Sequence, residues 1–121
     1  MRVDDEKSKS KLLKAISDAN MRDILTRTVK EAKSASDLSY ETRVPLSSIY
    51  RYFRELNESG LVTVERATIT DQGKRLELYR SLIKSVLVQF EPSSAYLELQ
   101  PNEDSESKFY RLWSSIREVS R

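Results

Sequence analysis

One segment of 31 residues, from position 34 to position 64, constrains the fold of this chain more than any other. Within it, Ile49, Phe53 and Leu56 are spaced i, i+4 and i+7, so all three lie on one face of a predicted helix. A shorter helix precedes it, and Val44 lies in the turn between the two. This spacing predicts two helices packed across Val44 at a steep angle, which is the geometry of a helix-turn-helix.

The residues that begin and end these helices support the same fold. Ser34 is a suitable N-cap, with Asp37 three residues later in the first turn. Pro45 cannot continue the first helix and suits the start of the second. Gly60 stands where a helix end favours a left-handed residue, and Leu61–Val64 has the β-branched character of a strand. Together these signals predict a helix-turn-helix followed by the first strand of a wing.

The segment as a whole resembles the winged helix-turn-helix of ArsR-like transcriptional regulators, especially archaeal ones. The resemblance lies in Leu38-Ser39, Val44-Pro45, Ser48 to Phe53, Glu55-Leu56 and Ser59 to Val62. A weaker similarity covers residues 12–90. The resemblance implies an α+β fold with a three-helix core and a β-wing, and it implies sequence-specific binding of double-stranded DNA.

The turn between the helices departs from the family pattern, because the family usually has glycine where this chain has Arg43. If φ is positive there, Arg43 carries a backbone strain of about 1 kcal/mol. Otherwise the turn is reshaped, and the angle between the two helices changes with it.

The outward face of the second helix is the candidate DNA-binding surface. Arg51 or Arg54 could bond guanine O6 and N7 or a phosphate, and Tyr50 could contact a thymine methyl or a phosphate. An ion pair between Arg54 and Glu58, four residues later, is the alternative role for this face. The predicted DNA-binding residues are Arg43, Ser47, Ser48, Tyr50, Arg51, Arg54, Lys74 and Arg75.

The last two of these residues belong to the predicted wing. Residues 61–70 and 75–80 predict its two strands, which are joined by a turn where Gly73 can adopt positive φ. At the tip, Lys74 and Arg75 would reach the DNA backbone or minor groove. A plain surface turn is the alternative.

Three parts are predicted along the chain. Residues 1–8 form a charged, flexible tail, and residues 9–81 form the winged helix-turn-helix domain. Residues 82–121 form an extension. The segments 81–90 and 96–99 predict two strands of an additional β-hairpin, which is followed by a C-terminal helix.

The C-terminal helix, predicted at residues 105–119, has a strongly apolar face. This face consists of Phe109, Leu112, Trp113, Ile116 and Val119. A winged helix closes its core without this element, so we expect the face, together with Leu12 of the first helix, to form a homodimer interface. The alternative is that the helix folds back onto its own domain.

The chain contains no cysteine and no histidine, which excludes disulfides, cysteine zinc sites and histidine bases. Without thiolate or imidazole ligands, the metal sensing associated with ArsR-like proteins loses its physical basis, and no metal or other cofactor is expected. No phosphate-binding glycine loop or nucleophile motif is visible, so we expect no enzyme activity. There is no signal peptide and no apolar stretch near the ~20 residues of a membrane span, so the expected location is the cytoplasm.

Charge is distributed unevenly around a net value of +2. Residues 11–90 contain 14 basic and 10 acidic side chains, whereas residues 91–121 contain 4 and 6. The basic part coincides with the candidate DNA-binding part. We therefore expect a homodimeric transcriptional regulator whose effector is unknown. The alternative is a winged-helix protein-interaction module in a transcription or chromatin assembly, and salt-dependent DNA binding separates the two.

Overall fold

The computed structural model of the chain describes residues 1–120, with side chains described as far as residue 116. Five α-helices, one short 3₁₀ helix and five strands follow one another within these residues. In chain order they are β1 (Arg2–Val3), α1 (Glu6–Ser17), α2 (Ala19–Thr28), α3 (Ala35–Thr42), α4 (Leu46–Glu58), β2 (Val62–Ile69), β3 (Arg75–Ser81), β4 (Ile83–Glu91), β5 (Ser94–Pro101), η1 (Glu103–Ser105) and α5 (Glu106–Ser120).

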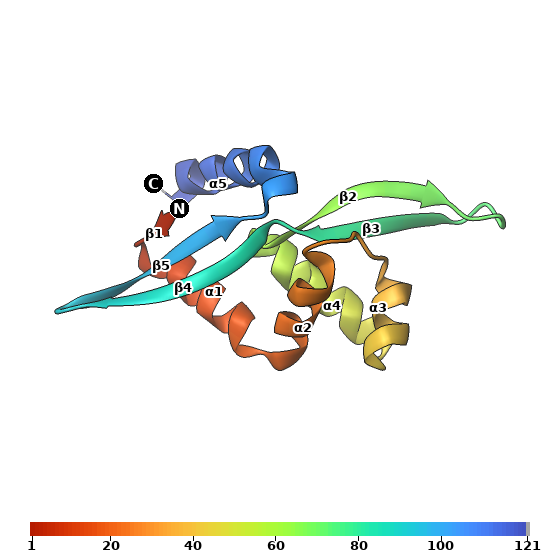
Figure 1. The fold of residues 1–121 in the computed structure, drawn as a ribbon, viewed down its shortest axis with the longest axis horizontal. Helices are drawn as coiled ribbons and strands as arrows, with labels where there is room; N and C mark the ends of the chain where they lie inside the picture. The colour runs from red at the N-terminus through yellow and green to blue at the C-terminus, as the bar shows by residue number, and fades with distance from the viewer. Residues whose placement is uncertain (121) are drawn as a thin grey trace.

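The strands form two antiparallel sheets. One is the β2–β3 hairpin, and the other has the strand order β1-β5-β4. The two hairpins, β2–β3 and β4–β5, point in opposite directions along the long axis of the molecule (Figure 1). Helices α3 and α4 form the helix-turn-helix, and β2–β3 is the wing that follows it. The fold is therefore an α+β winged helix-turn-helix with an additional hairpin and a C-terminal helix, as the sequence predicted.

Side-chain caps fix where the helices begin. Asp18 accepts hydrogen bonds from the backbone N–H groups of Asn20 at 2.8 Å and Met21 at 3.1 Å, which starts α2. Ser34 and Asp37 bond each other's backbone N–H groups, both at 3.0 Å, in a capping box that starts α3. The expected cap at Ser34 is thus confirmed. Such caps are each worth about 1 kcal/mol because they satisfy N–H groups that the helix itself leaves unpaired.

One hydrophobic core holds the helices and both sheets together. Phe53 and Leu56 of α4 pack in the same cluster as Leu12 of α1 and as Leu97 and Leu99 of β5, all at most 2% exposed. The core therefore includes the segment after residue 82, which the sequence suggested as an extension. Removing these side chains from water is what stabilises the packing of the second hairpin onto the helices.

The prediction of a flexible tail at residues 1–8 is wrong. Arg2 and Val3 form β1 and pair with Glu98 and Leu97 of β5. The amino group of Met1 donates to the carbonyl oxygen of Leu99 at 2.6 Å, and Val3 is 2% exposed. A two-residue strand is too short to show an alternating pattern, and the charged residues that follow it concealed the apolar Val3.

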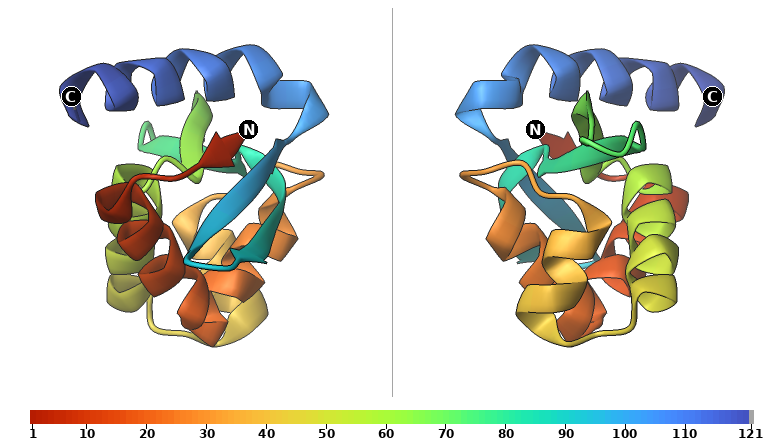
Figure 2. Two further views of the ribbon diagram at one scale, coloured as in Figure 1. Left: turned by 90° about the vertical axis from the view of Figure 1, so that its left-hand side faces the viewer. Right: turned by 90° about the vertical axis from the view of Figure 1, so that its right-hand side faces the viewer.

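The expected dimer interface is also corrected, because α5 packs on its own chain. Figure 2 shows α5 lying across one end of the molecule, over the strands. Phe109 and Trp113 are 0% and 2% exposed, and Trp113 Nε1 donates to the carbonyl oxygen of Gly60 at 3.1 Å. Leu12 is fully buried as well. These three side chains are enclosed in the core of one chain, so they cannot form contacts with a second chain.

The remaining members of the predicted α5 face are less enclosed. Leu112 and Ile116 are partly buried and pack against the core cluster. The side chain of Val119 lies outside the described residues. The structure therefore supports the alternative reading of this helix, in which it folds back onto its own domain.

Candidate nucleic-acid interface

Helix α4 has two chemically different faces. Its buried side chains are Ile49, Tyr52, Phe53 and Leu56. Tyr52 is 8% exposed, and the Asn20 side-chain amide donates to its hydroxyl at 3.0 Å. On the opposite side, Ser47, Tyr50, Arg51 and Arg54 are exposed. The buried face fixes the orientation of the helix, so the basic face points outward for a definite structural reason.

The first turn of α4 offers backbone donors to an anion. Pro45 occupies the N-cap position, and among the described residues no side chain caps the helix. The Pro45 carbonyl accepts from the N–H groups of Ser48 and Ile49 at 2.9 and 3.1 Å. The two residues before them, Leu46 and Ser47, are exposed. N–H groups at a helix start, together with the hydroxyl of Ser47, suit a phosphate oxygen.

The turn between α3 and α4 keeps the left-handed conformation that glycine usually supplies in the family. Arg43 has φ 63° and ψ 16°, and its N–H donates to the Ser39 carbonyl at 2.9 Å. A left-handed residue other than glycine costs about 1–2 kcal/mol. The Ser39 hydroxyl donates to the Val44 carbonyl at 2.7 Å and helps to hold the turn. The strained turn leaves the Arg43 side chain exposed beside the start of α4.

The wing ends in a tight turn that displays two basic residues. Gly73 has φ 79°, its N–H donates to the Thr70 carbonyl at 2.8 Å, and the N–H of Thr70 donates to the Lys74 carbonyl at 2.8 Å. Lys74 and Arg75 follow this turn and are exposed. A Glu77 carboxylate lies 3.8 Å from the Arg75 guanidinium, which is a weak surface contact. Both cations therefore remain available to a polyanion.

A cleft of about 300 Å³ separates the helix-turn-helix from the wing. Tyr50 of α4 and Lys74 and Arg75 of the wing line it together, so the structure brings these three predicted residues to one place. Ser36 and Leu46, which the sequence did not single out, also line the cleft. The other predicted contacts, at Arg43, Ser47, Ser48, Arg51 and Arg54, lie outside it, in the turn and along α4.

An aromatic stack attaches the wing to α4. The ring of Tyr79 on β3 lies 3.8 Å from the ring of Phe53, centroid to centroid, with 11° between their planes. Burial raises the pKa of Tyr79 to about 12, and its hydrogen bond to Glu77, of 3.0 Å, adds to the rise. The phenol is therefore neutral at physiological pH. Sequence reasoning placed Tyr79 on a strand but gave it no role.

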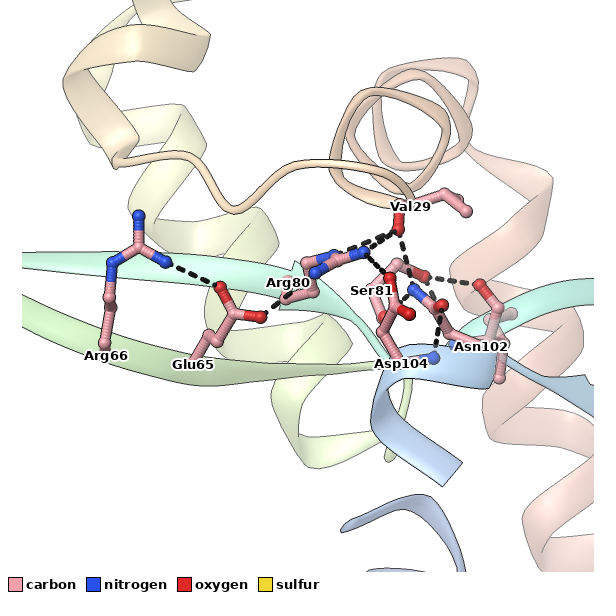
Figure 3. Close-up of polar contacts among 8 residues, drawn as sticks. Val29, Glu65, Arg66, Arg80, Ser81, Asn102 and Asp104 are labelled. Atoms are coloured by element: carbon pink, nitrogen blue, oxygen red, sulfur yellow. Dashed lines mark hydrogen bonds and ion pairs between the residues drawn. The ribbon is translucent and has the colours of Figure 1, made fainter. Parts of the chain in front are cut away.

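A buried arginine joins the base of the wing to the rest of the protein (Figure 3). Arg80 is 7% exposed and donates to the Val29 carbonyl at 2.8 and 3.0 Å, to Glu65 at 3.0 Å and to Asp104 at 2.7 Å. Asn102 donates to the same Val29 carbonyl at 2.7 Å. Burial lowers the pKa of Arg80. The hydrogen bonds and negative charges of the two carboxylates raise this pKa by more than burial lowers it, so it lies above its ordinary value. The guanidinium stays charged and links α2, the wing and the segment before α5.

The sequence contained a weak sign of this junction. Arg80 takes the next place in the alternation of Leu76 and Leu78 along β3, where a third apolar residue would be expected. A charge at such a position requires partners. Those partners lie 15 to 51 residues away along the chain, and no local pattern could have identified them.

The part of the chain that the structure describes contains no cluster of three or more acidic, histidine or cysteine side chains that could hold a metal ion. Its helices include none that is both long and apolar enough to cross a bilayer.

No family model and no curated protein matches this chain. Several solved structures are similar to it. HlyU from Vibrio cholerae N16961 is 16% identical over 88% of each chain, with a TM-score of 0.43. A winged helix-turn-helix DNA-binding domain from Mycobacterium bovis, described as homodimeric and as possibly of the ArsR family, is 13% identical over 94% of this chain and 79% of its own, with a TM-score of 0.46.

A third structure, an ArsR family transcriptional regulator, is 12% identical over 93% of this chain and 94% of its own, with a TM-score of 0.43. Similarity this low does not show what the present chain binds. A proposal about binding therefore rests on the residues of this chain and on their geometry.

Proposed function

We propose that this protein binds double-stranded DNA in a sequence-specific manner and regulates transcription as a homodimer. The observation that carries the proposal is the division of α4 into a buried face and an exposed basic face. A helix of this kind fits the major groove, where an arginine can bond guanine and a hydroxyl can bond a phosphate. The chain itself supplies no thiolate or imidazole, so regulation by a soft metal ion is not part of the proposal.

The wing supports the same surface. Lys74 and Arg75 lie across the cleft from Tyr50, so a DNA backbone seated on α4 would pass between the two elements. Contacts of this kind position a protein on DNA without reading its sequence. We predict that Arg51 and Arg54 contact bases. The wing, Arg43 and the start of α4 are expected to contact the DNA backbone.

The experiment begins with selection of bound sites from a random double-stranded pool and continues with anisotropy titrations on the selected site. Arg51→Ala should weaken binding by about 1–3 kcal/mol if Arg51 contacts a base. Arg111→Ala, which removes an exposed arginine of α5, is the matched control and should leave the affinity unchanged. Unchanged affinity in both Arg51→Ala and Arg54→Ala would show that α4 is not the recognition helix.

The alternative function, a protein-interaction module, has one observation in its favour. Tyr40 on α3 is 88% exposed and Leu46 at the start of α4 is 41% exposed, so the helix-turn-helix also displays apolar surface. Such side chains occur at protein interfaces as well as on DNA-facing helices. The two functions differ in salt dependence. A DNA-binding protein loses affinity steeply as salt rises, because counterions are released from the phosphates on binding.

A further inference from the structure

The outer strand of the second sheet exposes apolar side chains. Strand β4 pairs with β5 on one edge, and within the described residues no strand covers its other edge. Phe90 is 83% exposed, Leu87 is 52% exposed and Val88 is 36% exposed. The segment from Val86 to Phe90 carries no charge and has high β-propensity. Such an edge is a template for pairing with another strand, and proteins rarely leave one open.

The register of the hairpin shows where these side chains point. Val86, Val88 and Phe90 pair with Leu99, Leu97 and Ala95, without a bulge between them. Residues paired in this way lie on the same face of a sheet. Leu97 and Leu99 face the core, so the exposed Phe90 side chain points to the core side of the sheet. The hairpin extends beyond α1, so this part of its core-facing surface is not covered by the helices (Figure 1).

A cavity of about 280 Å³ lies on the same side of the sheet, between α2 and β4. Its apolar walls come from Ile16, Leu25 and Val29 of the helical layer and from Ile83 and Val86 of β4. No residue of β5 is among its lining residues in the described structure, so the cavity lies at the open edge of the sheet. A strand added to that edge would carry a side chain into it.

We propose that β4 pairs antiparallel with β4 of a second copy of this chain, about a two-fold axis at Val88. In this register Val88 faces Val88 of the second copy, and Phe90 faces Val86. The Phe90 side chain of each copy then enters the cavity between α2 and β4 of the other. The two three-stranded sheets become one six-stranded sheet, and the contact is self-complementary, as a two-fold interface requires. This inference deepens the homodimer of the proposed function by naming its surface.

Other pairings fit less well. An axis at Leu87 would place Phe90 opposite the charged Lys84, in the irregular part of the strand between Ile83 and Ser85. A parallel pairing would set Lys84 beside Lys84 of the second copy. The axis at Val88 instead places Glu91 opposite Ser85 and next to Lys84 of the second copy, so opposite charges meet at both ends of the paired strands. This charge arrangement favours a second copy as the occupant over an unrelated strand.

The ends of β4 limit the pairing to this stretch. The strand is irregular between Ile83 and Ser85, and Lys84 there is exposed. Pro92 follows the other end and cannot donate a ladder hydrogen bond. Both features discourage further strands from adding along the edge. The open segment between them is the part that the proposed dimer uses.

The test measures self-association without DNA, by sedimentation velocity across a concentration series. The wild-type protein should dimerise, and Phe90→Asp should raise the dissociation constant of the dimer at least about 100-fold. Ile69→Asp is the matched control, because Ile69 is an apolar residue 69% exposed at the other hairpin and should leave the dimer intact. Circular dichroism of each variant checks that it remains folded.

A second measurement locates the axis directly. Because the chain has no cysteine, Val88→Cys introduces a single thiol, and the two copies of residue 88 face each other at a separation suited to a disulfide. Mild oxidation should cross-link Val88→Cys into a dimer and Leu87→Cys far less. A monomeric wild-type protein, or a dimer that Phe90→Asp leaves unchanged, would overturn the inference. Because both measurements omit DNA, failure of DNA binding alone would contradict the proposed function and leave this interface standing.

Discussion

The two β-hairpins of this protein share a local structure and differ in the chemistry that they present. The wing, β2–β3, displays Lys74 and Arg75 at its tip, whereas the β4–β5 hairpin displays Val88 and Phe90 near its end. They extend to opposite ends of the molecule (Figure 1). The backbone pattern alone would not separate them. The exposed side chains do, since cations suit a polyanion and an open apolar edge suits another strand.

The hairpins also differ in how they are attached. The second hairpin contributes Leu97 and Leu99 to the central core, where they are 1% and 0% exposed. The wing is held at its base by Tyr79 and Arg80, while its outer half, including Ile69, stands away from the core. The second hairpin should therefore matter for folding, and the outer part of the wing should matter mainly for binding.

The largest expected effect is on the free energy of unfolding, and it appears when one leucine is truncated in each hairpin and the two variants are compared. Leu99→Ala should lower the free energy of unfolding by about 2–5 kcal/mol, because it opens a cavity in the core. Leu76→Ala, in the partly exposed wing, should cost less than about 1 kcal/mol. Urea denaturation measures both values. Equal costs for the two variants would contradict the difference in attachment.

A smaller effect should appear in DNA binding. Replacing both Lys74 and Arg75 by alanine should reduce the slope of log affinity against log salt by about 2, or about 1 for each phosphate contact. The matched control replaces Lys108 and Arg111, two exposed cations of α5, and should keep the original slope. Titrations at several salt concentrations provide the measurement. An unchanged slope in the wing variant would mean that its tip is only a surface turn.

The smallest effect is confined to alkaline pH and concerns the base of the wing. The pKa of Tyr79 is about 12 in the folded protein, above its ordinary value of 10.0. A raised folded-state pKa contributes stability that is present below pH 10.0 and is lost as pH rises toward 12. The wild-type protein should therefore lose more stability over this interval than Tyr79→Phe, whose side chain cannot ionise. Parallel curves of unfolding free energy against pH for the two proteins would refute this role.

Local patterns were enough to predict the helix-turn-helix and the wing. The capping box at Ser34, the spacing of Ile49 and Phe53, and the glycines at 60 and 73 each act within a few residues, so the sequence displays them directly. Their agreement identified the fold without any knowledge of distant contacts. The same patterns predicted the exposed face of α4, because the apolar spacing identifies the buried face and the exposed face is the opposite side of the helix.

The parts that could not be predicted depend on distant partners. The apolar face of α5 was visible in the sequence, but periodicity cannot say whether such a face covers its own chain or another. Gly60 illustrates the point. It ends α4 with φ 76°, and a Cβ there would also lie 3.1 Å from the Trp113 ring. The positive φ is a local requirement at the helix end and was recognised in the sequence. The lack of room for a Cβ depends on Trp113, a residue 53 positions away.

The junction between the two hairpins would determine how far apart a dimer holds its two recognition helices on DNA. A single residue, Leu82, separates β3 from β4, and it is 1% exposed. Its N–H donates to the Leu61 carbonyl at 2.8 Å, and its own carbonyl accepts from Asn102 at 2.9 Å. The chain therefore has no hinge between the proposed DNA-facing and self-pairing surfaces. A dimer built this way would hold its two recognition helices at one fixed separation and phase, so the spacing of half-sites would be discriminated as strictly as their bases.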